Sequence, residues 1–297
     1  MNNKNTHSAI ILCGGMSRRM GEDKGSMKIN DKPMIIHVLE AISTQINEVI
    51  LVFNDSERIS KYKSLLHNFL ITEKDISKNK NSEYSKDKRN IAEYNFDGFN
   101  VSLIFVEDEI KDKGPLSGIM TGLKTISSDY ALVLPCDSPY INYKFIEYIF
   151  SILDKNLAIN AINDNIDSIV PFHIENIGTI ENIENVGNIE NISHIENAED
   201  IKSIKDFENI VSESNGLFYD SIENKKLKKE IVKNSEPLHS IYKKENYDTI
   251  NNLLKSDEKQ VKSFLKTINS YFIPIDNEKI QKINFKNINY KEDLDNY

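Results

Sequence analysis

One short apolar run near the start of the chain constrains the fold more than any other feature. Residues 8–13 read SAIILC, and the run ends directly at Gly14-Gly15. A strand-length run that is apolar at almost every position is typical of strands covered on both faces, as in a parallel sheet between helices. The run therefore predicts a central buried strand, followed by a loop whose glycines let a ligand approach closely.

Similar apolar runs recur along the first half of the chain, and helical patterns lie between them. The elements expected there are strands at 48–53, 101–106 and 130–134 and helices at 34–46, 114–126 and 144–153. This alternation predicts right-handed βαβ units and an α/β fold, a Rossmann-like three-layer sandwich with a mostly parallel sheet. The elements expected beyond residue 236 are strands at 238–242 and 271–275, a helix at 247–254, an extended stretch at 285–289 and a short helix at 290–296.

Two stretches break this pattern and predict insertions into a single domain that spans 1–297. Residues 73–98 carry twelve charges in 26 positions, with no sustained apolar period. Residues 174–235 are low in complexity and then polar, and Ile-Glu-Asn occurs five times between residues 174 and 197. A hexapeptide β-helix would need a stricter repeat, so a surface insertion is the favoured interpretation.

Charge and cysteine content limit the partners that the chain can have. Its formal net charge is −9, and residues 174–210 alone hold nine acidic and two basic residues. An acidic chain argues against a broad nucleic-acid-binding surface. The sequence shows no secretory signal or apolar stretch of membrane-spanning length, and its two cysteines form no disulfide framework. We therefore expect a cytoplasmic protein with no nucleic-acid or membrane partner.

The loop after the first predicted strand, LCGGMSRRMGEDK, carries the strongest chemical signal. Gly14 and Gly15 permit close backbone approach, and successive N–H groups of such a loop bind anions. Ser17 adds a hydroxyl group, while Arg19 and Lys24 add positive charge. The loop therefore predicts a polyphosphate site. It is neither a GxGxxG dinucleotide loop nor a GxxxxGK[ST] loop, because no glycine directly precedes Lys24.

An aspartate follows a later predicted strand in the same way. Asp137 comes shortly after the strand expected at 130–134, within the run LPCDSPY. Ligands of open α/β sheets bind at the carboxyl ends of strands, and a carboxylate there can hold Mg²⁺ together with substrate phosphates. Capping of the next helix or turn is the alternative role for Asp137. Residues 114–118 (GPLSG) open a predicted helix whose start could contact a nucleotide, although a simple Gly-Pro turn explains them equally well.

Together these motifs resemble the molybdenum cofactor guanylyltransferases, a branch of the glycosyltransferase-A-like nucleotidyltransferases. The family pattern LxGGxSxRMGxDK is matched by residues 12–24, and its next Lys-Pro by residues 32–33. The later family motifs GPLxG, PCDxP, PLxxxY and N[VI]NxxxDL are matched in order by 114–118, 135–139, 237–242 and 287–294. The resemblance covers most of 6–172 and 236–296. The chain departs from the family at Cys13, where alanine is usual, and at Tyr290-Lys291, where Thr-Pro is usual.

The resemblance implies an enzyme that transfers GMP from GTP to the terminal phosphate of molybdopterin and releases pyrophosphate, with Mg²⁺ as its cofactor. It implies catalytic roles for Lys24, Arg19 and Asp137, and metal binding by Asp137 and Asn289. The GTP-binding residues implied in the same way are Leu12, Cys13, Gly14, Gly15, Ser17, Lys24, Asn54, Asp108, Gly114, Pro115, Leu116 and Asp137. The pterin-facing residues would be Pro237, Leu238 and Tyr242.

Other functions stay open at this stage. Cytidylylation of the same pterin and guanylylation of phospholactate would suit the same fold, and an adaptor would bind nucleotide or cofactor without catalysis. The presence of both Lys24 and Asp137 speaks against the adaptor. GTP and molybdopterin are the partners that the resemblance implies, with transient contacts to cofactor-synthesis proteins or molybdoenzyme apoproteins as a further option.

The cysteines and histidines carry weaker signals. Cys13 and Cys136 both end predicted strands, so they could be neighbours, and small buried fillers are favoured over a regulatory disulfide. His239 lies inside the PLxxxY segment, but a surface position would explain it equally well. The remaining histidines show no metal-ligand spacing.

We predict that residues 174–210 can be replaced by a short linker without loss of catalysis. The segment has too little apolar variety to build a core, and the entropy cost of a surface loop grows only slowly with its length. The measurement is pyrophosphate release by the shortened protein beside the full chain. A shortened protein that is insoluble or inactive would contradict the interpretation of this segment as an insertion.

Overall fold

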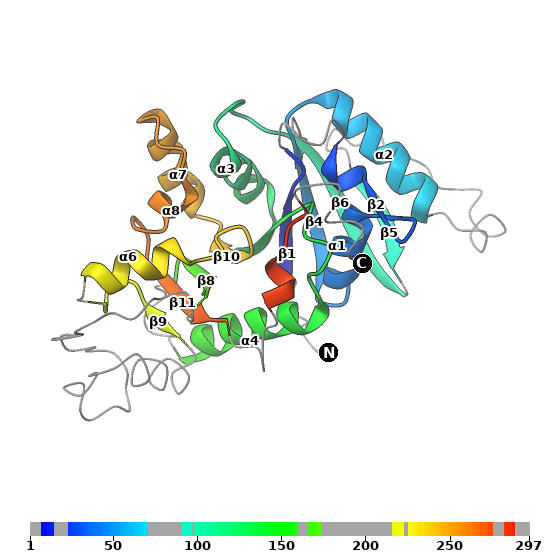
Figure 1. Ribbon diagram of the computed structural model, residues 1–297. Coiled ribbons are helices and arrows are strands. Elements are labelled where there is room, and N and C mark those ends of the chain that lie inside the picture. Colours follow the sequence, from blue (N-terminus) through cyan, green and yellow to red (C-terminus); the bar gives the residue numbers. More distant parts are fainter. Residues whose placement is uncertain are drawn as a thin grey trace.

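Nine strands form one mixed sheet with helices on both faces (Figure 1). The computed structural model describes residues 7–14, 23–70, 91–96, 98–159, 166–173, 216–222, 225–275 and 282–288. The strands of the large sheet are β1 (His7–Leu12), β4 (Ile46–Phe53), β5 (Ile91–Phe96), β6 (Phe99–Glu107), β7 (Tyr130–Pro135), β8 (Ser168–Phe172), β9 (Leu217–Phe218), β10 (Ser240–Lys243) and β11 (Ser270–Pro274). A separate small hairpin pairs β2 (Lys28–Ile29) with β3 (Lys32–Pro33).

The helices divide between the two faces of the large sheet. The α-helices are α1 (Met34–Ile42), α2 (Ser56–Leu70), α3 (Pro115–Thr125), α4 (Tyr143–Ile159), α6 (Lys225–Lys233), α7 (Asn246–Lys255) and α8 (Val261–Phe264). The 3₁₀ helices within the described residues are η1 (Lys24–Ser26) and η4 (Lys282–Phe285). One buried apolar cluster joins α1, α2 and α4 to one face, and a second joins α3, α6, α7 and α8 to the other. The result is the three-layer arrangement that the sequence predicts.

The sheet order is β5-β6-β4-β1-β7-β10-β8-β11-β9. The four consecutive strands β6, β4, β1 and β7 are parallel, and β8 and β11 run in the same direction. Only β5, β10 and β9 run against them. The prediction of a mostly parallel sheet is therefore confirmed. Its four central parallel strands end at the same edge of the sheet.

The central position of β1 explains its unbroken apolar sequence. Ala9 and Ile11 pack in the cluster of α1, α2 and α4, whereas Ile10 and Leu12 pack in the cluster of α3 and α6–α8. Side chains of a strand alternate between faces, so both faces of β1 need apolar residues. All four side chains are at most 8% exposed.

Some predicted boundaries differ from the structure. The helix expected at 34–46 ends at Ile42, because residue 46 already begins β4. Within the insertion expected at 73–98, residues 91–96 form β5, which pairs antiparallel with β6. Its one charged side chain, Glu93, is tolerated because β5 lies at the sheet edge.

The insertion expected at 174–235 likewise includes residues that belong to the sheet and to a helix packed on it. Its last part contains β9, which pairs with β11, and α6. Leu227, Ile231 and Val232 form an apolar stripe on α6 that is buried against the sheet, while lysines occupy much of its outer surface. The many lysines around these three residues obscure the apolar periodicity, so the sequence did not predict this helix. Residues 174–215 lie outside the described residues, as does the helix expected at 290–296, and η4 occupies the start of the stretch expected to be extended at 285–289.

Close packing of α3 on β1 sets the position of the α3 N-terminus. Gly118 and Gly122 lie one helical turn apart and face β1, where a Cβ on Gly118 would lie 2.9 Å from Leu12 Cδ2. The absence of side chains at these two positions lets the helix approach the strand. Within the described residues, no helix is long and apolar enough to cross a membrane.

We predict that Gly122→Ala destabilises the protein. The new Cβ would lie 2.5–2.8 Å from three side-chain atoms of Ile10, which is fully buried. Overpacking costs about 1–3 kcal/mol, and this exceeds the ~1 kcal/mol that alanine gains over glycine inside a helix. Urea unfolding should therefore give a free energy of unfolding lower by about 1 kcal/mol.

The matched control removes the atoms that clash. In an Ile10→Ala background, Gly122→Ala should be neutral or stabilising, because Ile10 Cγ1, Cγ2 and Cδ1 are gone. An equal loss of stability in both backgrounds would show that contact with Ile10 is not the cause.

Candidate active site

The ends of four neighbouring parallel strands supply the polar residues of the candidate site. Asp108 follows β6, Asn54 follows β4, Gly14 lies just past β1, and Asp137 lies just past β7. Because the four strands are parallel and adjacent, these residues meet at one sheet edge, in the spatial order of the strands. Residues that are far apart in the sequence thus form one row.

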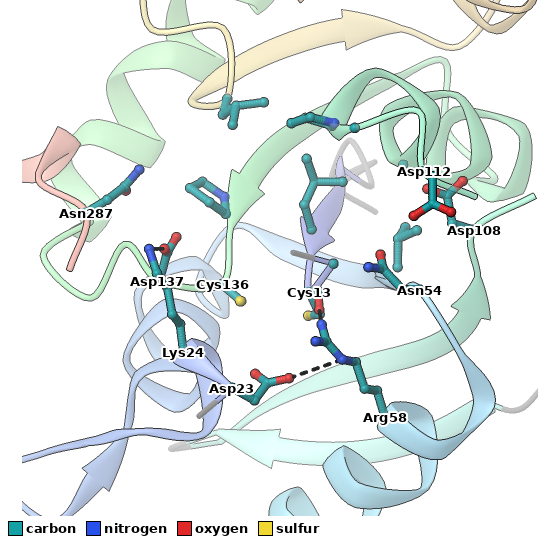
Figure 2. A pocket seen from close by; sticks show the side chains of 18 residues that line it. Cys13, Asp23, Lys24, Asn54, Arg58, Asp108, Asp112, Cys136, Asp137 and Asn287 are labelled. Carbon is teal, nitrogen blue, oxygen red and sulfur yellow. Dashed lines mark hydrogen bonds and ion pairs between the residues drawn. The ribbon is translucent and has the colours of Figure 1, made fainter. Parts of the chain in front are cut away.

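A cavity of about 670 Å³ lies along this row (Figure 2). This volume is in the range of small-molecule sites. The sequence-predicted residues that line it are Leu12, Cys13, Gly14, Lys24, Asn54, Asp108, Gly114, Pro115, Asp137 and Leu238. Most of the predicted site residues that the structure describes therefore surround one cavity.

One side of the cavity is formed around Asn54 and Asp108. Gly14 lies so close to Asn54 that any Cβ on Gly14 would overlap the amide oxygen Oδ1. This position therefore requires glycine because of a close approach. The contact holds the Asn54 amide against the start of the glycine loop, at the cavity wall.

Asp108 is fixed by donors from its own loop and from α3. The Ser117 hydroxyl lies 2.6 Å and the Thr121 hydroxyl 3.0 Å from Oδ1, and the Ile110 N–H donates to the same oxygen. Burial raises the pKa of Asp108 above its ordinary value, although these hydrogen bonds act in the opposite direction. Among the described residues, all three contacts go to Oδ1 and none to the second oxygen.

Lys24 and Asp137 meet in the cavity as an ion pair. Lys24 Nζ lies 2.9 Å from Asp137 Oδ2, and the two side chains are 22% and 15% exposed. Lys24 begins η1, after the glycine loop, whereas Asp137 follows β7. A fixed cation and a carboxylate are therefore held at the same point of the wall (Figure 2).

Two further charged residues, Asp23 and Arg58, line the cavity beside this pair, and the sequence analysis did not select them. Asp23 accepts a hydrogen bond from the Tyr62 hydroxyl, and Arg58 Nε lies 3.6 Å from the other Asp23 oxygen. Arg58 also donates to the carbonyl oxygen of Cys13, at 3.4 Å. Burial, followed by the nearby Cys136 and Cys13 thiols, raises the pKa of Tyr62 well above its ordinary value, so its hydroxyl remains a donor. These contacts from α2 anchor the residue that directly precedes Lys24.

The two cysteines are buried neighbours on the cavity floor. Register pairs Leu12 with Pro135, so Cys13 and Cys136 follow on adjacent strands, and both thiols are free. Burial raises the pKa of Cys13, and its contact with Cys136 raises it further. Two free, buried thiols fit the interpretation as small fillers.

Three predicted site residues lie away from the cavity wall. Leu116 is fully buried in the core under α3. Tyr242 is also fully buried, and its hydroxyl donates to the Pro237 carbonyl at 2.7 Å, so it supports the loop from behind instead of facing a substrate. Of the pterin-facing set, only Leu238 lines the cavity. Gly15, Ser17, Arg19 and Asn289 lie outside the described residues.

The structure adds cavity residues that sequence reasoning did not select. They are Asp23, Val52, Arg58, Asp112, Gly118, Pro135, Cys136 and Asn287. Asp23 and Asn287 are inside quoted motifs and could have been found from them. Arg58 and Asp112 lack such a signal, because only the packing of α2 and of the loop before α3 brings them to the cavity. His239, for which a surface position was an option, is 1% exposed.

Comparisons with known proteins agree with this architecture. A curated relative from Syntrophotalea carbinolica, named molybdenum cofactor guanylyltransferase, is 31% identical over 56% of this chain and 60% of its own length. Another from Methanothermobacter thermautotrophicus, named probable molybdenum cofactor guanylyltransferase, is 28% identical over 56% of this chain and 64% of its own length. The matched region thus spans less than two thirds of these relatives.

A solved structure and a family description extend the comparison to most of the chain. The crystal structure of molybdopterin-guanine dinucleotide biosynthesis protein A from Archaeoglobus fulgidus has a TM-score of 0.54 and 17% identity, over 97% of this chain and 95% of that chain. This likeness shows the shared fold. Residues 9–270 match the family described as MobA-like NTP transferase domain. The chain therefore belongs to the MobA-like NTP transferase domain family.

Proposed function

We propose that this protein transfers GMP from GTP to the terminal phosphate of molybdopterin and releases pyrophosphate. The observation that carries the proposal is the row of Asp108, Asn54, Gly14 and Asp137 along one cavity, with Lys24 paired to Asp137. The names of the curated relatives support the choice of substrates. The product would be the guanine dinucleotide form of the cofactor.

The two sides of the cavity suit the two ends of a nucleotide. Asn54 and Asp108 offer an amide and a carboxylate, which can accept and donate hydrogen bonds at the edge of a base or at a ribose. Lys24 and Arg58 place positive charge farther along the wall, where a triphosphate would need it. Gly14 lies between these groups and lets the backbone approach the ligand.

Mg²⁺ fits the donors present beside Lys24. The described residues contain no cluster of three or more histidine, cysteine, aspartate or glutamate side chains that could hold a metal ion. Mg²⁺ does not need such a cluster, because it is usually held by one or two carboxylates together with substrate phosphates and water. Asp137 would supply the carboxylate, and we retain Asn289 as a proposed second ligand. The bound ion would neutralise phosphate charge as the reaction proceeds.

The reaction needs alignment and charge neutralisation more than proton transfer. An oxygen of the acceptor phosphate attacks the α-phosphorus of GTP, a new P–O–P bond forms, and the bond to pyrophosphate breaks. A phosphate monoester is already anionic and nucleophilic, so no general base is required. Lys24 and Arg19 would stabilise the charge on the departing pyrophosphate, while Asn54 and Asp108 would hold the nucleoside in place.

We predict that the wild-type protein releases pyrophosphate from GTP only when molybdopterin and Mg²⁺ are both present. Asp137→Ala should lower turnover at least a hundredfold, because it removes the proposed metal ligand and breaks the ion pair with Lys24. The matched control is Asp129→Ala, since Asp129 directly precedes the same strand at its opposite end. Near-normal turnover of Asp137→Ala with an unchanged Mg²⁺ dependence would exclude Asp137 as the metal ligand.

We also predict that GTP is preferred over CTP by at least about tenfold in competition. The second oxygen of Asp108 could accept from the N1–H and 2-amino groups of guanine, and cytosine has no equivalent pair of donors. Asp108→Asn should reduce this preference, whereas Glu109→Gln, a change of its exposed neighbour, should not. The measurement is the ratio of guanine to cytosine dinucleotide pterin formed from mixed nucleotides. A predominant cytosine product would contradict the assignment of GTP.

A further inference from the structure

A buried polar network lies under the Asp137 side of the cavity. It joins Ser138 after β7, His239 before β10 and Asn287 after η4. Ser138 is fully buried and His239 is 1% exposed. Neither side chain lines the cavity, but Asn287 does. The network therefore reaches the cavity through the Asn287 amide.

The single hydrogen of the Ser138 hydroxyl determines the direction of the whole network. Ser138 Oγ donates to Asn287 Oδ1 at 2.5 Å. Its hydrogen is then used, so the contact of 2.9 Å with His239 Nε2 requires His239 to donate and Ser138 to accept. The Asn287 oxygen is thereby occupied inside the protein. The amide group that remains for a ligand is the NH₂, which carries two donors.

The His239 ring is itself held on several sides. Its Nδ1 lies 3.7 Å from Glu236 Oε2, and the other Glu236 oxygen contacts His173 Nε2 at 2.8 Å. The Phe285 ring meets both imidazole rings edge-on, with centroid distances of 5.2 Å and 5.7 Å. Burial acts to raise the pKa of Glu236, but its contacts with His173 and His239 outweigh burial and lower that pKa to about 2. Its burial and the packed Phe285 ring leave His239 little freedom to turn.

Asn287 stands on the side of the cavity where an acceptor would enter. Figure 2 shows Asn287 and Asp137 on one side and Asn54, Asp108 and Asp112 on the other. The backbone reinforces this position, because the N–H of the next residue donates to the Asp137 carbonyl at 3.2 Å. If the nucleoside occupies the side of Asn54 and Asp108, the acceptor must approach past Asp137. An NH₂ group there would meet an anionic or carbonyl oxygen of that substrate.

We infer that His239 is a positioning residue: through the Ser138 hydroxyl it fixes the Asn287 amide with its NH₂ group toward the acceptor. The inference rests on the proposed function, because that function defines the acceptor as a phosphate-bearing pterin. It assigns no contact between His239 and substrate. Without the hydrogen on His239 Nε2, Ser138 would lose its donor, and the amide would be free to turn its oxygen toward the cavity.

Steady-state kinetics test the inference with GTP and molybdopterin varied separately. His239→Leu should raise the KM for molybdopterin about tenfold, the effect of one lost hydrogen bond to a charged group. It should change the KM for GTP less than twofold, and Ser138→Ala should behave in the same way. His239→Gln, whose amide nitrogen can donate to Ser138, should restore most of the loss. His67→Leu, on the exposed face of α2, is the control.

A double-variant cycle separates positioning from general damage. In an Asn287→Ala background, His239→Leu should not raise the acceptor KM further, because the group that it positions is gone. An equal tenfold increase in both backgrounds would overturn the inference. Equal increases in the KM values for GTP and molybdopterin would overturn it too, since they would indicate a general disturbance of the cavity.

Side-chain amide NMR without substrate keeps this test independent of the proposed function. The Asn287 NH₂ signals are identified by their loss in Asn287→Ala. They should shift or broaden in His239→Leu and in Ser138→Ala, and return toward the wild-type position in His239→Gln. If wild-type protein forms no guanine dinucleotide, the proposed function fails while the NMR result still judges the network. If the wild-type protein forms the guanine dinucleotide but the Asn287 signals are unchanged in His239→Leu and Ser138→Ala, only the inferred network is overturned.

Discussion

The parallel pairing of β1 with β4 and β7 is the interaction on which the site depends. Register places Leu12 beside Val52 on one side and Pro135 on the other. The hydrogen bonds continue past the strands, from Cys13 N to the Val52 carbonyl and from Cys136 N to the Leu12 carbonyl. Because such a ladder fixes each strand along its length, the residues that follow the strands arrive at one level. A one-residue slip of β1 would also exchange the side chains that its two faces present, so α3 would no longer meet Ile10 and Leu12.

Paired charges make the resulting cavity stable in the folded protein. Carboxylates that are partly removed from water need counter-charges or hydrogen bonds. Lys24 provides one for Asp137, and Arg58 and the Tyr62 hydroxyl provide them for Asp23. A polyphosphate with a divalent cation brings both signs of charge. It can therefore make favourable contacts with the same groups that hold each other in this structure.

The two sides of the cavity are built differently, and this difference fits a reaction with two substrates. The Asp108 side is fixed by α3, which approaches β1 closely because of its glycines. The opposite side is closed by the loop before β10 and by the segment after η4, which come from the end of the chain. Buried contacts between Ser138, His239 and Asn287 join these late segments to the end of β7. This side of the cavity is therefore complete only when these late segments have folded onto the sheet.

The sequence by itself determined the fold class, the central strand and many of the residues that line the cavity. Periodicity reveals buried strands, so Gly14 and Asp137 could be found from the ends of two of them, whereas Asn54 and Asp108 came from the family resemblance. Only the tertiary structure decided which other residues join them. Arg58 reaches the cavity because α2 packs against the sheet, and Tyr242 is buried because both faces of β10 are covered by apolar clusters. The Ser138 hydroxyl group contacts His239 and Asn287 from two distant segments, and no local pattern in a sequence encodes such contacts.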